Sequence, residues 1–136
     1  YGGFAFHNLC FIKFLLTYLC KISIVDTKAI EMLIEPGAEK LIRQMGRRLK
    51  TKARSKVINL ILNHIREEYH NSEITEWFSE IRLSTDKRTT IRISLENANY
   101  LNFISQVVSQ GRPTVTLELV YFAAANLSRE DLESLV

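Results

Sequence analysis

The chain has 136 residues, of which 46% are hydrophobic, so it can bury a core as one compact domain or as two very small ones. Cys10 and Cys20 are its only cysteines, and neither they nor the three histidines show metal-ligand spacing. We therefore expect reduced thiols, no metal and no cofactor. The formal net charge is a modest +3, so the placement of the charges is more informative than their total.

The first 26 residues form a hydrophobic extension that could be taken for a membrane segment. Lys13 lies in its middle, and the uninterrupted apolar run is shorter than the ~20 residues that a spanning helix needs. Leu9, Ile12, Leu16 and Leu19 share a helical face, which predicts an amphipathic helix that packs on the body or on another subunit. The alternative is that this segment is not native to the folded protein. We expect no membrane association.

The stretch from Arg43 to Lys56 contains seven basic residues and no acidic residue. A local patch of this kind favours an anionic partner, and the alternative is a solvated helix face followed by a loop.

A strand, a helix, a turn and a second helix are predicted twice, and the copy at residues 87–127 has the clearer pattern. Residues 88–95 alternate between polar and apolar side chains, with Ile91, Ile93 and Leu95 on the inner face. We expect Asn97 to cap a helix that Gly111 ends. Its apolar positions are Leu101, Ile104, Val107 and Val108.

Pro113 suits the first turn of the second helix in this copy. Its predicted buried stripe consists of Leu117, Val120, Tyr121 and Ala124. A strand over residues 114–121 is the competing interpretation, because these residues also alternate and include several with high strand propensity.

The other copy occupies residues 27–70. Ile30, Met32 and Ile34 alternate with Ala29, Glu31 and Leu33, and Pro36 then enters a helix. Its apolar residues are Leu41, Ile42, Met45 and Leu49, and the next helix carries Val57, Ile58, Ile61, Leu62 and Ile65. Ile34 to Lys50 and Leu95 to Gly111 both span sixteen positions, so the copies agree in element order and in length.

Residues 71–86 are predicted to be a structured linker with a short helix, and residues 128–136 an acidic tail with an N-capped turn or short helix. Trp77 and Phe78 favour a role in covering the core over stacking on bases, because nearby glutamates would repel phosphate.

A single strand per copy leaves both of its edges unpaired, so each copy needs a partner strand. We expect the strand over residues 28–35 to pair antiparallel with the strand over residues 88–95. The fold class is then mostly α with a short two-stranded antiparallel ribbon. The outer face of such a ribbon can enter the major groove of DNA.

This pattern resembles the ribbon-helix-helix family of Arc, MetJ and CopG type, and its doubling resembles the tandem TraY-like relaxosome proteins. The resemblance implies double-stranded DNA binding in the cytoplasm, as a transcriptional regulator or as a plasmid DNA-processing factor in conjugation. It places base readout at Thr90, Arg92 and Ser94. It places phosphate contacts at the two turns before the second helices, at Lys50, Lys52, Arg54, Ser55, Arg112 and Thr114.

Arg92 is the best candidate for guanine recognition, because a guanidinium group can donate two hydrogen bonds to one base. The strand at 28–35 departs from the pattern. Its outward positions are Ala29, Glu31 and Leu33, and only Glu31 could accept a hydrogen bond from a base, namely cytosine.

The main alternative is a protein-interaction module, such as an antitoxin-like regulator that holds a partner through its acidic tail or its N-terminal segment. We expect no enzyme, because the sequence lacks a glycine-rich phosphate loop and any catalytic pairing at a credible spacing.

Overall fold

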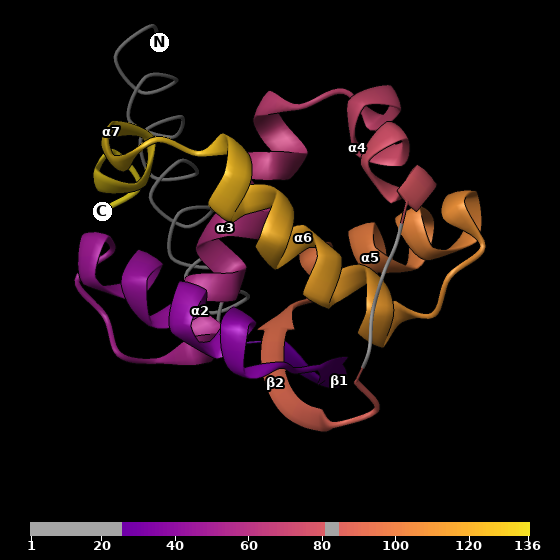
Figure 1. The fold of residues 1–136 in the computed structure, drawn as a ribbon, viewed down its shortest axis with the longest axis horizontal. Helices are drawn as coiled ribbons and strands as arrows, with labels where there is room; N and C mark the ends of the chain where they lie inside the picture. The colour runs from indigo at the N-terminus through magenta and orange to yellow at the C-terminus, as the bar shows by residue number, and fades with distance from the viewer. Residues whose placement is uncertain (1–25, 81–84) are drawn as a thin grey trace, which may run out of the picture.

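The computed structural model describes residues 26–80 and 85–136 (Figure 1). These residues are mostly helical, with one two-stranded sheet and six α-helices. The elements in chain order are β1 (Thr27–Leu33), α2 (Pro36–Arg48), α3 (Arg54–Glu68), α4 (Asn71–Trp77), the 3-10 helix η1 (Phe78–Glu80), β2 (Arg88–Ser94), α5 (Leu95–Val108), α6 (Arg112–Asn126) and α7 (Arg129–Glu133). The predicted amphipathic helix in the first 25 residues lies outside the described part.

The two strands pair antiparallel, as the sequence predicts, and form a ribbon at the lower edge of the molecule in Figure 1. Ile30 faces Ile91 at the centre of the pairing, and both side chains are buried. The inner face of the ribbon is therefore sealed against the helices. Because no further strand joins this sheet in the described part of the chain, helices or solvent must cover its outer edges.

Two residues depart from the predicted faces of the ribbon. Leu95, expected on the inner face, is 51% exposed, because β2 ends at Ser94 and the chain turns into α5 at Leu95 itself. Leu33, expected on the outer face, is buried. The outward apolar position that the sequence suggested in β1 is thus not available to a partner.

Helices α3, α5 and α6 contact the ribbon. The second helix after each strand packs on the other strand, so that α3 lies against β2 and α6 lies against β1. α6 runs through the middle of the molecule (Figure 1) and is buried at every position from Val115 to Val120. Residues 114–121 lie within this helix, so the strand alternative is wrong.

The helix boundaries confirm some sequence signals and correct others. Pro36 begins α2, as expected. The cap of α5 is Ser94, whose hydroxyl accepts the Asn97 N–H, so Asn97 is not the cap. The left-handed residue after α5 is Ser109, with φ 56°, whereas Gly111 has an extended backbone and precedes α6.

The linker and the tail both pack on the body. Phe78 is buried, and the Trp77 indole N–H donates to the Glu118 carboxylate at 3.1 Å, so these aromatic side chains cover the core as predicted. Ser128 caps α7 with a reciprocal bond from Asp131, and Leu132 is buried. No helix within residues 26–80 and 85–136 has the length and apolar character needed to cross a bilayer.

Candidate nucleic-acid interface

The outer face of the ribbon carries polar side chains that are tied to each other across the strands. The Arg92 guanidinium donates to the Thr27 hydroxyl at 3.0 Å and to the Thr27 carbonyl at 3.5 Å. The exposed Glu31 carboxylate forms an ion pair with Arg88 at 3.1 Å. Thr90 is exposed and lies opposite Glu31 in the register. Arg92, Thr90 and Glu31 therefore share one exposed face of the ribbon.

α3 seals the outer edge of β2 through two polar side chains of its first turns. The Ser55 hydroxyl oxygen accepts the Arg92 N–H at 3.0 Å, and the Asn59 amide donates to the Arg92 carbonyl at 3.0 Å. The Asn59 carbonyl oxygen also accepts the Ser94 N–H at 2.9 Å. Both the N–H and the carbonyl group of Arg92 are thus bound by side chains of α3. The backbone of Arg92 in one strand-helix-helix segment is therefore held in place by a helix of the other segment.

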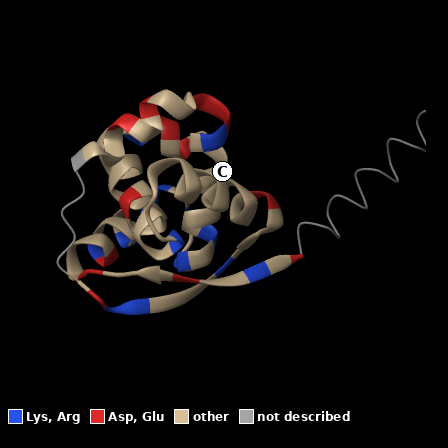
Figure 2. Ribbon diagram, turned by 90° about the vertical axis from the view of Figure 1, so that its right-hand side faces the viewer, with Lys and Arg blue, Asp and Glu red and all other residues tan. Residues whose placement is uncertain are grey.

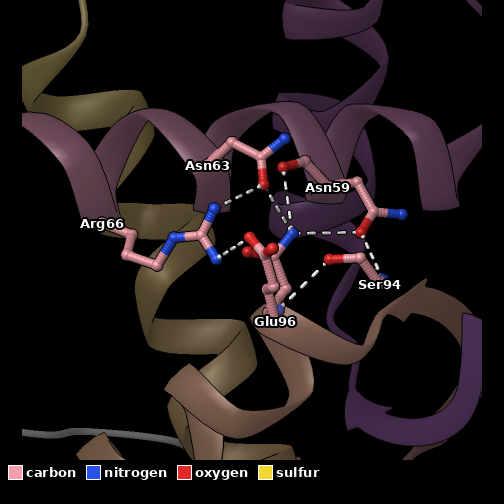
Figure 3. A network of polar contacts seen from close by, with 6 residues as sticks. Asn59, Asn63, Arg66, Ser94 and Glu96 are labelled. Carbon is pink, nitrogen blue, oxygen red and sulfur yellow. Dashed lines mark hydrogen bonds and ion pairs between the residues drawn. The ribbon is translucent and has the colours of Figure 1, made fainter. Parts of the chain in front are cut away.

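A partly buried polar network continues from this edge into the space between α3 and α5 (Figure 3). The amide group of Asn97, which is fully buried, donates to the carbonyl oxygens of the Asn59 and Asn63 side chains at 3.1 and 2.9 Å. Arg66 bonds to Asn63 and forms an ion pair with Glu96 at 3.1 Å. Because a buried amide needs partners to offset its desolvation, these contacts fix the two helices relative to each other.

Three of the residues predicted to contact phosphate surround the start of α3. Lys50 and Lys52 are exposed, and Lys50 occupies a left-handed conformation with φ 56°. Ala53, the residue before the helix, offers no side chain to the free N–H groups of the first turn, and that turn contains no acidic residue. The hydroxyl hydrogen of Ser55 is still available, because its oxygen serves Arg92 as the acceptor. These donors together form an anion-binding arrangement.

Arg54, which is also predicted to contact phosphate, has a structural role beside it. Its guanidinium donates to the Thr89 hydroxyl of β2 at 2.9 Å and to the Glu39 carboxylate at 3.3 Å. It therefore links α2, α3 and the ribbon, so a change at Arg54 would disturb the structure as well as the charge.

The corresponding turn before α6 carries fewer cationic side chains than the turn before α3. Arg112 and Thr114 are half-buried at its start, and Gly111 precedes the helix without a side-chain cap. Arg112 is the only Lys or Arg between residues 95 and 126. In Figure 2 most Lys and Arg positions lie in the half of the molecule that holds the ribbon, together with several Asp and Glu positions, while the opposite end carries mainly Asp and Glu. The charge thus favours an anionic partner at the ribbon side.

Among the residues predicted for base readout, Ser94 is the one with the least freedom. Its hydroxyl caps α5 and it is only half-exposed. Asn59 is a residue of this region that sequence reasoning missed. It lies on the polar side of a helix with a clear apolar stripe, and no local signal relates it to a strand 33 positions away.

No protein-family model, curated protein or solved structure matches this chain. Among the residues that the structure describes, no three His, Cys, Asp or Glu side chains are grouped so that they could hold a metal ion.

Proposed function

We propose that residues 27–70 and 87–127 are two ribbon-helix-helix units in tandem, and that the chain binds double-stranded DNA through the ribbon that they share. Both strands have seven residues, and both second helices have fifteen. Each second helix packs on the strand of the other unit. This crossed packing is what two copies related by an approximate twofold axis would produce.

The observation that carries the proposal is the two-stranded ribbon with one sealed and one open face. A ribbon of two strands is narrow enough for the major groove of B-DNA, which is about 12 Å wide. Its inner face is fixed by Ile91 and Ile93, which are buried, while Arg92 and Thr90 remain exposed on the other side. Groove entry therefore requires no opening of the core.

In this proposal Arg92 reads a guanine, with Thr90 and Glu31 beside it. Arg92 first has to exchange its bonds to Thr27 for bonds to the base, and Glu31 has to leave Arg88 to accept from a cytosine. The hydrogen bond from Arg92 to Thr27 and the ion pair between Glu31 and Arg88 are both exposed to solvent, so breaking them costs little free energy. The residues that position the duplex by its phosphates are Lys50, Lys52, Arg54, Ser55, Arg112 and Thr114, and such contacts carry no sequence information.

The chain then acts in the cytoplasm by binding DNA, without a catalytic site, either as a transcriptional regulator or as an accessory factor in plasmid DNA processing. Both roles use the same binding chemistry. An operator next to the gene would support the first role, and a site at a transfer origin would support the second.

The test is to select a duplex from a random pool and to measure its affinity by fluorescence anisotropy, beside a scrambled duplex, over a range of NaCl concentrations. We expect affinity to fall with a slope near −0.9 in log-log terms for each phosphate contacted. Arg92→Ala should weaken the selected duplex more than the scrambled one, by ~1 to 3 kcal/mol.

Lys52→Ala is the matched control, because Lys52 is exposed and belongs to the phosphate set. It should weaken both duplexes equally and reduce the salt slope by about one unit. Salt-independent binding would refute DNA binding by this surface, and equal losses for Arg92→Ala on the two duplexes would remove Arg92 from the readers.

A second candidate function, a protein-interaction module of antitoxin-like type, is favoured by the outer side of α5. Leu95, Phe103 and Val107 are 51%, 46% and 50% exposed and recur at helical spacing. The acidic tail is a poorer docking site than the sequence suggested, because Leu132 is buried and Glu133 pairs with Arg48 at 3.9 Å. Phe103→Ser should abolish partner binding and leave DNA affinity unchanged if this function holds.

A further inference from the structure

The two units differ most in the charge of their first helices. Between Glu39 and Glu67 the chain has no acidic residue and nine basic ones. Four of them recur at helical spacing along the exposed side of α2 and just beyond its end, and their side chains point to solvent: Lys40, Arg43, Arg47 and Lys50.

A hollow of about 670 Å³ lies between this side of α2 and the segment that returns to α3. Five cations line it: Arg43, Arg47, Lys50, Lys52 and Arg54. Glu39 is its only carboxylate, and Arg54 already pairs with it. The hollow therefore has an unbalanced positive charge that suits a row of phosphates.

The hollow adjoins the ribbon. Arg54 lines the hollow and at the same time donates to Thr89 of β2. From this point α2 and the returning segment extend away from the ribbon (Figure 1). A helix of 13 residues is about 20 Å long, which corresponds to about six base pairs of B-DNA at 3.4 Å each.

The other unit has no counterpart of this surface. α5, which takes the place of α2, has no Lys or Arg from Leu95 to Val108, and its exposed side carries Phe103 and Val107. A duplex held in the ribbon would thus meet a strongly basic surface beside one end of its site and a nearly neutral one beside the other.

We infer that the α2–α3 hollow binds the phosphates of the duplex that flanks the ribbon site on one side only, so that the complex has an asymmetric footprint. This inference rests on the proposed function. The flanking contact adds affinity without adding sequence preference, because it is made to the backbone alone.

The experiment uses the full chain and the selected site in three duplexes: the site alone, the site with eight random base pairs added on the left, and the site with the same addition on the right. One addition should tighten binding by about 10-fold and steepen the salt slope by about two units, as two to three more phosphates are neutralised. The other addition should leave both unchanged.

Arg43→Gln should reduce the gain in salt slope from the effective addition by about one unit and weaken the gain in affinity, while leaving affinity for the site alone unchanged. Arg129→Gln, which removes one charge from α7 outside the hollow, is the matched control and should keep the gain. Equal gains from both additions, no gain from either, or a gain that Arg43→Gln does not reduce would each overturn the flanking contact while the ribbon site stands. Failure to bind any of the three duplexes would instead overturn the proposed function, and the flanking contact with it.

Discussion

Replacing Asn59 by alanine should destabilise the fold by about 2 kcal/mol, although Asn59 contributes nothing to the apolar core. Its side chain makes three bonds to other elements: it donates to the Arg92 carbonyl and accepts from the Ser94 N–H and the Asn97 amide. A net contribution of ~0.5 kcal/mol for the exposed bond and ~1 kcal/mol for each more buried one gives ~2.5 kcal/mol. Alanine recovers ~0.5 kcal/mol because it favours helix more than asparagine does.

Urea unfolding followed by circular dichroism and by the fluorescence of Trp77, the single tryptophan, measures this difference. Asn99→Ala is the matched control, because Asn99 is exposed on α5 and the same substitution there changes helix propensity alone. Hydrogen exchange adds a local test, since the Ser94 amide loses its acceptor in Asn59→Ala and should exchange faster, whereas the Arg92 amide keeps its acceptor, the Ser55 hydroxyl.

The reasoning is refuted if Asn59→Ala and Asn99→Ala have the same free energy of unfolding. It is also refuted if the Ser94 amide keeps its protection while the protein is destabilised, because the seal on this part of the ribbon edge would then not depend on Asn59.

Three further changes have definite expected outcomes. Gly46→Ala should destabilise by at least ~1 kcal/mol in urea unfolding, because a Cβ there would lie 2.6 Å from the Thr51 carbonyl oxygen; unchanged stability would mean that the turn can shift freely. Ser109→Gly should stabilise by ~0.5 kcal/mol, since φ is 56° at Ser109, and a loss would contradict the left-handed assignment. Burial raises the pKa of Glu118 above its usual 4.5, and the hydrogen bond from Trp77 opposes this shift in part. The folded state therefore binds the proton of Glu118 more tightly than the unfolded chain does. The folded state is expected to lose stability as pH rises from 4.5 through the raised pKa. Glu118→Gln keeps an acceptor for Trp77 and should remove this loss, giving a flatter stability profile over that pH window than the unchanged chain.

Local patterns were sufficient to predict most of the secondary structure. Alternation over residues 88–94 predicts β2, and the apolar stripe from Val57 to Ile65 predicts α3, because each pattern repeats with the period of its own backbone. The short capping motif at Ser128 was also predictable, since its partner Asp131 is three residues away. The failures lie at the junctions, where Leu95 enters a helix and Ser109, not Gly111, takes the left-handed conformation.

The sequence by itself determined that the chain has an alternating strand bearing Arg92 and an acid-free basic segment from residue 40 to residue 66. Only the tertiary structure decided that these features adjoin, because Arg54 reaches Thr89 across 35 positions of chain. It also decided that Asn59 and Ser55 hold the edge of β2. The physical reason is that periodicity and charge act between near neighbours, whereas the partner of a strand edge is chosen by the packing of the buried helices α3 and α6.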